Sequence, residues 1–315
     1  MSTAEATAGT IAQPQVLEAP AAKKPRFKDT WWRHVVAIGA IAFSIFPVVF
    51  VTSAAFDSSN SVSGTSVLPT NFTTDNFKQI LTNTVQDQSA TGNVDSQFLR
   101  WFANSMIVAG VAALFTVVLG ALAAYAFSRF RFKGRRMGMM TLLLIQVFPQ
   151  FLAIVAIYLI VHNVGDIFPT LGLNSTIGLI VVYLGGALGI NAWLMKGFFD
   201  TIPTELDESA RVDGATPSQI FWGVVLPLAA PVLAVVGLIS FVFTLNEFVI
   251  ASTLLQTSSH FTLPVGMRGF IDQQYGQRWG PFAAGALLAA IPASLLFMFL
   301  QRWIVSGLTQ GAVKG

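Results

Sequence analysis

Residues 205–228, "ELDESARVDGATPSQIFWGVVLPL", form an acidic segment between two long apolar runs. Two glycines and two prolines interrupt it. Its acids fall within nine positions of a chain in which only 10% of residues are charged: Glu205, Asp207, Glu208 and Asp213. A segment of this kind does not cross lipid, so the apolar runs on either side decide what kind of molecule contains it.

The composition is that of a membrane protein. The 315 residues are 54% hydrophobic and 12% aromatic, with a mean hydropathy of +0.65, which is more apolar than usual for a soluble domain. The absence of cysteine and the presence of only three histidines argue against a disulfide framework, a metal site and a thiol nucleophile. The net charge of +3 comes from basic residues beside apolar runs, which indicates membrane topology and not nucleic-acid binding.

Six stretches are long enough to cross a hydrocarbon core of about 30 Å, which takes about 20 helical residues. We therefore predict an all-α integral membrane protein with six transmembrane helices. A closed β-barrel would need alternating segments of about 10 residues, whereas these runs are continuously apolar. The predicted spans are Val35–Phe56, Ala103–Phe127, Met137–Val161, Thr176–Phe199, Ala229–Leu255 and Pro281–Ile304.

The distribution of Lys and Arg predicts the orientation of the spans. If the N-terminus is cytoplasmic, only four of the 18 basic residues lie in outer segments, namely Lys78, Arg100, Arg268 and Arg278. Both termini are therefore expected in the cytoplasm. A cleaved signal peptide is the alternative for residues 23–55, but the apolar run exceeds the roughly 7–15 residues usual for one.

The predicted organisation has four parts. Residues 1–30 are expected to be a disordered cytoplasmic tail, and 31–100 the first span with an external insertion whose function the sequence does not indicate. Residues 101–304 form the transmembrane core, with a cytoplasmic loop at 200–227, and 305–315 form a cytoplasmic tail.

The acidic segment is predicted to be a helix, a tight turn and a second helix between spans four and five. Thr204 is expected to cap the first helix, with acids in the first turn, where the helix dipole favours negative charge. Gly214 can adopt the left-handed conformation that ends this helix. Thr216-Pro217-Ser218-Gln219 has the pattern of a capping box with proline at the first helical position. A simple solvated connection is the alternative.

The spacing within this segment resembles the EAA signature of ABC-importer permeases. Glu208-Ser209-Ala210 is followed after three residues by Gly214, and after nine more by Val224-Val225-Leu226-Pro227. The family pattern is Glu-Ala-Ala, three residues, Gly, nine residues and Ile-x-Leu-Pro. Ser209 and Val224 are conservative departures from it.

The resemblance covers roughly residues 31–315. In detail, the chain is similar to the smaller, six-span subunit of the maltose and maltodextrin permeases. Ala312 is a mild departure in the tail. The segments concerned are "NSMIVAG" (104–110), "AYAFSRFRFKGRR" (124–136), "VFPQFLAIVAIYLI" (147–160), "VYLGG" (182–186) and "RWIVSGLTQGAVKG" (302–315).

This resemblance implies a type I ABC-importer permease in the inner membrane of a prokaryote. The implied partners are a second permease, two copies of an ATPase and an extracytoplasmic sugar-binding protein. ATP and Mg would be used by the ATPase, with no cofactor bound by this chain. The residues that the resemblance assigns to ATPase coupling are Glu205, Glu208, Ser209, Ala210, Asp213, Gly214, Leu226 and Pro227.

The sequence lacks the phosphate-binding motif of nucleotide hydrolysis, so the energy for transport has to come from elsewhere. Nucleotide hydrolysis of this type needs a G-x-x-x-x-G-K-[ST] loop, and neither Gly-Lys-Ser nor Gly-Lys-Thr occurs. We therefore expect a transport subunit and not an enzyme. The alternatives are a permease for another carbohydrate or solute, an ion-coupled secondary transporter and a structural scaffold. A secondary transporter usually has ionisable residues in several spans and inverted repeats, neither of which is evident.

Candidates for the translocation path are the polar residues of the spans. Glu247 is the acid within predicted span five, and at helical spacing it shares a face with Ser240, Thr244 and Ala251. It has two interpretations: it lines or gates the path, or it holds span five against a neighbour. For each of the other candidates, a hydrogen bond between helices is the alternative. They are Gln146, Gln150, Tyr183, Asn191 and Asn246.

Three further features suggest local structure. Pro149 is expected to kink span three. Gly185-Gly186 and Gly189 would let a neighbouring helix approach closely. By resemblance, residues 256–280 form an outer loop that reaches toward the binding protein, and a simple connector is the alternative.

Overall fold

The computed structural model describes residues 27–58, 69, 71–82, 85–86, 93–94, 97–272 and 278–312. Most of the predicted N-terminal tail, parts of the external insertion and the last three residues of the C-terminal tail lie outside the described residues. The chain divides into two units, Met1–Val48 and Val49–Gly315.

The first unit contains most of helix α1 (Phe27–Ala55). All side chains from Trp31 to Val48 are exposed, and Phe43 is 83% exposed. A helix that exposes apolar side chains all round is suited to lipid or to contact with other membrane helices. The stretch Trp31–Ala55 is long and apolar enough to cross a membrane, which agrees with the first predicted span.

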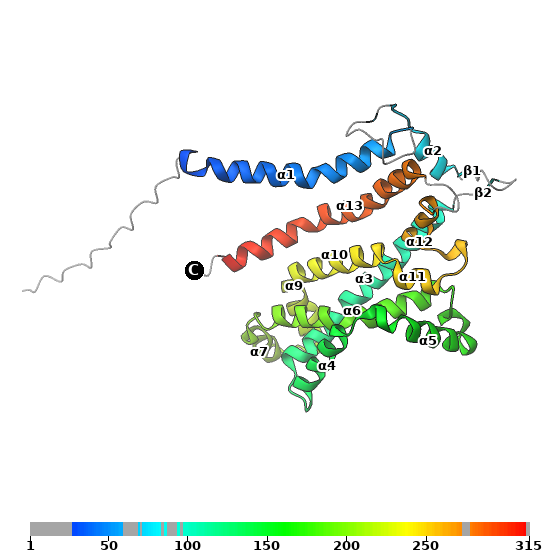
Figure 1. Cartoon of the computed structure of the whole chain (residues 1–315). Helices are drawn as coiled ribbons and strands as arrows, with labels where there is room; N and C mark the ends of the chain where they lie inside the picture. Colours follow the sequence, from blue (N-terminus) through cyan, green and yellow to red (C-terminus); the bar gives the residue numbers. More distant parts are fainter. Residues whose placement is uncertain are drawn as a thin grey trace, which may run out of the picture. The chain divides into compact units, whose positions relative to one another are not determined.

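The second unit is built around α3 (Phe98–Arg129), which packs against α6 (Thr176–Phe199) and α10 (Ala230–Asn246). Helix α10 packs in turn against α13 (Trp279–Ala312) (Figure 1). The bounds of α6 are those predicted from the sequence. Helix α13 continues past Ile304, where the sequence suggested that a tail begins.

The third predicted span, Met137–Val161, is not a single helix, so the prediction that Pro149 only kinks its helix is wrong. It consists of α4 (Arg135–Val147), the short helix η1 (Gln150–Ala153) and α5 (Ile154–Ile167). The chain is extended at Phe148 and Pro149 (ψ 126° and 113°). Proline has no N–H to donate to the helix, so the ladder of hydrogen bonds stops here instead of bending.

The fifth predicted span is also interrupted. Helix α10 ends at Asn246, Glu247 is extended (φ −69°, ψ 124°), and the chain resumes as α11 (Val249–Leu254). Glu247 therefore does not share a continuous helical face with Ala251, as the sequence spacing suggested.

The remaining elements are short and lie in the connections. One group of them lies toward one end of the second unit. This group consists of α2 (Asp75–Leu81), the antiparallel two-residue strands β1 (Val85–Gln86) and β2 (Asn93–Val94), η4 (Ser258–His260), α12 (Leu263–Met267) and η5 (Arg268–Phe270). Helix η2 (Pro169–Leu171) joins α5 to α6. Between α6 and α10 lie α7 (Thr204–Val212), α8 (Pro217–Ile220), the π-helical turn η3 (Phe221–Val225) and α9 (Leu226–Leu228).

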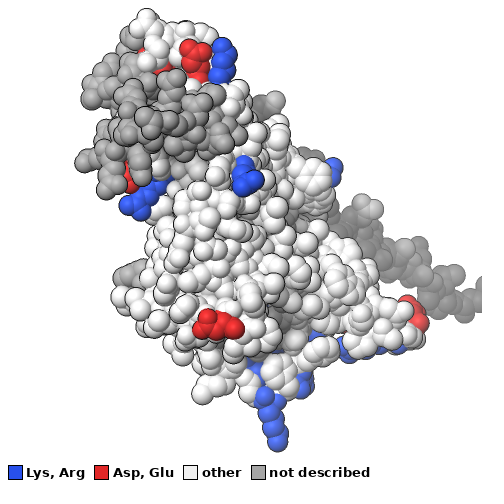
Figure 2. All heavy atoms as spheres, turned by 90° about the vertical axis from the view of Figure 1, so that its right-hand side faces the viewer, with Lys and Arg blue, Asp and Glu red and all other residues white. Residues whose placement is uncertain are grey.

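By length and composition, the described residues contain three unbroken membrane-spanning helices, within α1, α3 and α13. The count reaches five if each of two bent pairs is one span. These pairs are Thr176–Gly186 with Gly189–Phe199, bent by 51°, and Pro217–Leu228 with Ala230–Asn246, bent by 78°. The all-helical fold is confirmed. Uncharged residues predominate on the face drawn in Figure 2, as expected for a protein in contact with lipid.

Apolar side chains are buried in separate clusters along the bundle. One lies beside α12 and includes Ile80, Phe98 and Met267. Another lies beside α8, where α3, α6 and η3 bury Tyr125, Phe199 and Phe221. We call these two ends of the bundle the α12 end and the α8 end.

Two glycines allow close contacts in the second unit. A Cβ at Gly189 of α6 would lie 2.8 Å from the carbonyl oxygen of Leu142, so the predicted close approach at Gly189 is present. At Gly185 no neighbouring atom of the described residues lies within 4 Å of the corresponding position. Gly266 of α12 lies against the Trp101 indole of α3, where a Cβ would be 2.1 Å from a ring carbon.

Polar side chains of α3 hold the chain around α12. The Trp101 indole N–H donates to the carbonyl of Ser258 at 2.7 Å, and Asn104 donates to the carbonyls of Ser259 and Phe261 at 3.1 and 2.9 Å. The Ser105 hydroxyl accepts from the N–H of Leu263 at 2.7 Å. Helix α3 therefore fixes the segment 258–266 through both packing and hydrogen bonds.

The contact at Gly266 predicts a large effect for a small change. Gly266→Ala should lower the free energy of unfolding by about 1–3 kcal/mol, because a rigid indole has to move to admit the methyl group. Gly269→Ala is the matched control, since no atom of the described residues lies within 4 Å of its Cβ position. Thermal unfolding in detergent measures both. Equal melting temperatures for the two variants would contradict the packing described here.

Candidate functional site

Helix α7 is the first half of the predicted coupling loop. It begins at Thr204 and is preceded by Pro203, which makes no side-chain cap. The prediction that Thr204 caps it is therefore wrong, because the proline already turns the chain into the helix. Glu205 and Asp207 lie in the first turn, as predicted.

A Schellman motif ends α7. Gly214 has a φ of +83°, in the left-handed region, as predicted. Its N–H donates to the carbonyl of Arg211 at 3.0 Å, and the N–H of Ala215 donates to the carbonyl of Ala210 at 2.9 Å. These two bonds satisfy carbonyls at the helix end that have no partner within the helix.

The second half of the loop begins with the predicted capping box. The Thr216 hydroxyl accepts from the N–H of Gln219, and the Gln219 side chain accepts from the N–H of Thr216 at 2.8 Å. Pro217 takes the first helical position, where its missing N–H is not needed. After the π-helical turn η3 and α9, the chain bends by 78° at Ala229 into α10.

The predicted coupling residues lie mostly on the surface of this loop. Ala210 and Leu226 are half-buried. Val212, at 89% exposed, adds an apolar side chain to the accessible surface of α7. The exposed coupling residues are Glu205, Glu208, Ser209, Asp213, Gly214 and Pro227.

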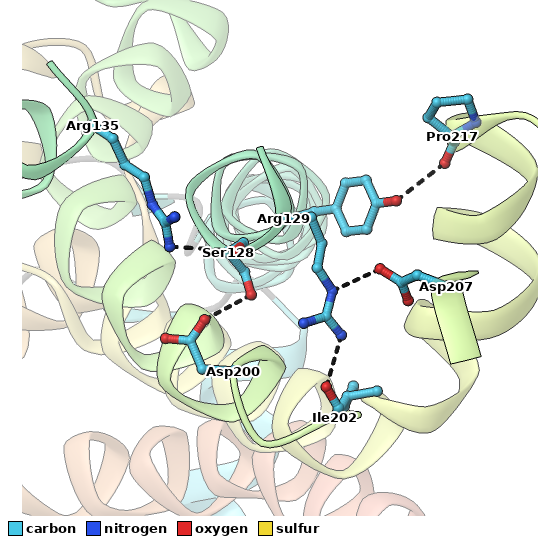
Figure 3. Close-up of polar contacts among 8 residues, drawn as sticks. Ser128, Arg129, Arg135, Asp200, Ile202, Asp207 and Pro217 are labelled. Atoms are coloured by element: carbon cyan, nitrogen blue, oxygen red, sulfur yellow. Dashed lines mark hydrogen bonds and ion pairs between the residues drawn. The ribbon is translucent and has the colours of Figure 1, made fainter. Parts of the chain in front are cut away.

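The buried side of α7 presents an acid to α3. Asp207 is 2% exposed, and its Oδ2 lies 2.8 Å from the Nε of Arg129 in the last turn of α3 (Figure 3). The approach is close, but it does not have the alignment of a hydrogen bond, so the contact is an ion pair. The other end of the guanidinium donates to the carbonyl of Ile202 at 2.9 Å.

Two neighbours of Arg129 on α3 contact the same loop (Figure 3). The Tyr125 hydroxyl donates to the carbonyl of Pro217 at 3.4 Å, and its ring lies 5.0 Å from that of Phe221. The Ser128 hydroxyl donates to the Asp200 carboxylate at 2.7 Å. Partial burial raises the pKa of Asp200, but hydrogen bonds from Lys196 and Ser128 outweigh this effect and hold the pKa below its ordinary value.

Sequence reasoning did not select Arg129 or Asp207 as site residues. The signal available was spacing: Asp207 stands three residues before Ala210, so both occupy one face of α7, and Ala210 packs into the cluster at the α8 end. An acid on an apolar face requires a cationic partner. Five Lys and Arg residues lie between 129 and 136, and the sequence does not indicate which of them pairs with this acid.

Among the path candidates, the structure brings Tyr183 and Glu247 together. The Tyr183 hydroxyl of α6 donates to Glu247 Oε2 at 2.5 Å. The same carboxylate accepts from the N–H groups of Ile250 and Ala251 at 2.8 and 3.0 Å. Glu247 therefore caps the start of α11 and ties it to α6.

The other path candidates lie apart or bond within the chain. The Asn191 amide donates to the Ser240 hydroxyl at 3.3 Å, which joins α6 to α10. Asn246 is exposed and donates to the carbonyl of Val242 in its own helix at 2.8 Å. Gln146 is half-buried, and its Oε1 lies 3.5 Å from the Cβ position of Gly189. The side chain of Gln150 lies outside the described residues. None of this tests a role in transport, which stays a prediction for all six.

A groove of about 690 Å³ runs between α3, α10 and α13. Its walls are apolar, which suits an apolar helix or a lipid chain and not a sugar. The described residues contain no group of three His, Asp or Glu side chains that could hold a metal ion. The lining residues are Gly110, Ala113, Leu114, Val117, Leu233, Ala234, Gly237, Phe241, Pro292, Leu295, Leu296, Phe299 and Leu300.

Comparison with protein families identifies what kind of protein has this loop. The family model described as binding-protein-dependent transport system inner membrane component matches residues 116–310, which is more than half of the chain. The chain belongs to this family. It is thus a permease subunit of an ABC importer, and the matched region includes α6, the whole of the loop 200–227, α10 and α11.

Individual relatives of this permease are similar over nearly their whole length. The maltose/maltodextrin transport system permease protein MalG of Vibrio parahaemolyticus is 39% identical over 286 residues, which are 90% of this chain and 96% of the relative. The galactooligosaccharides transport system permease protein GanQ of Bacillus subtilis is 39% identical over 271 residues, 86% and 90% of the two chains. A solved bacterial ABC transporter for import of the polysaccharide alginate contains a chain with the same fold, at a TM-score of 0.68 and 22% identity, covering 90% of this permease and 99% of that chain.

The bonds made by Glu247 predict its behaviour on substitution. Glu247→Gln keeps the size of the side chain but loses one acceptor oxygen, so it should lower the free energy of unfolding by about 1.5–3 kcal/mol. Tyr183→Phe should cost less, because it removes one of the three donors. The double variant should cost less than the sum of the two, because the residues share a bond.

Thermal unfolding of the four proteins in detergent measures this cycle. Asn246→Ala is a control, since among the described residues the exposed amide of Asn246 bonds within its own helix, to the carbonyl of Val242, and takes no part in the cap. If the costs of Glu247→Gln and Tyr183→Phe were additive, the bond between them would contribute nothing. If Glu247→Gln left stability unchanged but reduced transport, a role in the path would be favoured over capping.

Proposed function

We propose that this permease conducts maltodextrin-like oligosaccharides inward, driven by ATP hydrolysis in a separate ATPase that docks on α7. The observation on which the proposal depends most is α7 itself. It is a short helix ended by a Schellman motif, with exposed acids at Glu205, Glu208 and Asp213 and an exposed apolar side chain at Val212. A rigid helix of this kind fits into a groove of a partner, with its acids opposite basic side chains.

The choice of sugar as substrate is supported by relatives and not by a site in this chain. The relatives at 39% identity are named for maltose, maltodextrin and galactooligosaccharide transport. Within the described residues, the groove between α3, α10 and α13 has apolar walls that offer few partners for sugar hydroxyls. We therefore infer that the path is completed by a second permease, and that an extracytoplasmic binding protein delivers the sugar.

Docking of the ATPase on α7 requires this end of the bundle to lie in the cytoplasm. The distribution of basic residues supports this orientation, with both termini in the cytoplasm. In this orientation the ATPase, with its ATP and Mg, meets α7, and the segment around α12 faces the binding protein.

The orientation has a direct test because the chain has no cysteine. Asp213→Cys and Asp75→Cys each introduce one thiol at an exposed position, at opposite ends of the second unit. A membrane-impermeant maleimide should label Asp75→Cys in intact cells and Asp213→Cys only in inside-out vesicles. Labelling of Asp213→Cys in intact cells would reverse the proposed topology and remove the docking proposal.

The coupling proposal is tested by isolation and reconstitution. The tagged chain, isolated in mild detergent from the organism that encodes it, should bring down an ABC ATPase and a second permease. In proteoliposomes, maltotriose and the binding protein should stimulate ATP hydrolysis and uptake. Uptake that needs an ion gradient and no ATP would favour a secondary transporter instead.

A substitution in α7 gives the matched test. Gly214→Val forces a β-branched residue into the left-handed region, which should move Ala215 and Thr216 and weaken ATPase binding roughly tenfold. Gly197→Val is the control, because its Cβ position is open and its φ is not left-handed. ATPase retained per permease after washing is measured. Equal retention by both variants would show that the turn at Gly214 has no part in docking.

A further inference from the structure

The last turn of α3 is attached to the coupling loop at four separate points. Tyr125, Ser128 and Arg129 reach, in turn, Pro217 at the start of α8, Asp200 after α6, and both Ile202 and Asp207. These targets bracket α7 on both sides and include α7 itself. Figure 3 shows Ser128 and Arg129 at the end of this helix, with dashed lines to Asp200, Ile202 and Asp207.

Arg129 and Asp207 are the most deeply buried part of this attachment. Their side chains are 4% and 3% exposed, unlike the pairs Lys78–Asp75 and Lys196–Asp200, whose side chains are 21–70% exposed. A buried ion pair contributes little net stability compared with a well-packed apolar pair. Loss of either partner, however, is strongly destabilising, because it leaves the other charge buried and unpaired. Neither carboxylate oxygen of Asp207 has a hydrogen-bond partner among the described residues, so the ion pair with Arg129 is the principal polar contact of this carboxylate there.

The position of the pair gives it a consequence beyond folding. Asp207 lies on the buried side of α7, directly before Glu208 on the exposed side. A partner that contacts the exposed side of α7 at Glu208 is therefore one residue away, along the helical backbone, from the ion pair with Arg129. Arg129 belongs to α3, which also contacts α6, α10 and the segment around α12.

We propose that Arg129 is a positioning residue for coupling: through Asp207 it fixes α7 to the end of α3, so that movement of α7 is delivered to α3. This inference rests on the proposed function, in which an ATPase docks on α7. Helices α6 and α10 are joined to α7 by the chain, whereas α3 is joined to it by these side chains and by the apolar cluster that includes Tyr125 and Ala210. The ion pair makes the register of α7 on α3 specific, because a slip of one residue would leave both charges buried and unpaired.

The test uses the reconstituted complex with four forms of this chain besides the natural one. Asp207→Asn removes one charge while keeping the shape of the side chain. Arg129→Met combined with Asp207→Leu replaces the pair by apolar side chains, which should restore packing and assembly. Arg129→Lys keeps the charge and loses the planar fork. Asp75→Asn is the control, since it makes the same chemical change in an exposed pair.

Three quantities are measured: the amount of assembled complex, the stimulation of ATP hydrolysis by binding protein and maltotriose, and sugar taken up per ATP. We expect the double apolar variant to assemble normally with stimulation and uptake per ATP reduced about tenfold, within the usual range of coupling between two sites. Asp207→Asn should reduce stimulation and uptake per ATP by the same factor, measured per assembled complex. Arg129→Lys should reduce them by a smaller factor. Normal stimulation per assembled complex in the double variant would overturn the proposal and leave the pair a tertiary contact only.

A second measurement separates this proposal from the docking proposal. Spin labels on Leu122→Cys in α3 and Val212→Cys in α7 occupy exposed positions of a chain that has no other cysteine. In the chain without partners, the distance distribution should be narrow and should broaden with Asp207→Asn but not with Asp75→Asn. An unchanged distribution would refute fixation by Arg129, even if ATPase docking held. Failure of the natural chain to bind an ATPase would refute docking and leave the distance result to decide fixation.

Discussion

The hydrogen-bonding demand of the backbone in an apolar environment constrains every break in these helices. In lipid, each N–H and C=O has to find a partner inside the protein. The break between α10 and α11 frees N–H groups at Ile250 and Ala251, and the Glu247 carboxylate accepts both. Tyr183 then donates to the same carboxylate from α6. An acid in an apolar span is therefore part of what makes the break possible, whatever else it does.

The same demand explains why the polar side chains of α3 gather at its two ends. Trp101, Asn104 and Ser105 satisfy backbone groups of the segment around α12. Tyr125, Ser128 and Arg129 bind the loop 200–227 at the other end. With 32 residues, α3 is about 48 Å long and connects both loops as a single unbroken element. It is thus suited to transmit a displacement from one end of the bundle to the other.

Much of this architecture was predictable because the signals are local. The bounds of α6 followed from hydropathy, while the turn at Gly214 and the capping box at Thr216 followed from residues adjacent in the chain. The break at Pro149 was predicted as a kink, because a proline in an apolar run does not reveal whether the helix resumes on the same axis. The break at Glu247 was missed because no proline or glycine marks it. Its cause is a cap that depends partly on Tyr183, 64 positions away. The pair Arg129–Asp207 was missed for the same reason.

The bonding of the polar path candidates also limits how this permease can handle a sugar. Tyr183, Glu247, Asn191 and Asn246 all form hydrogen bonds within the chain in this conformation. A sugar hydroxyl that used one of them would first have to displace a partner, which offsets most of the gain. Weak contact suits a path, because a substrate that binds tightly does not leave it. Selectivity for one oligosaccharide would then come from groups outside this chain.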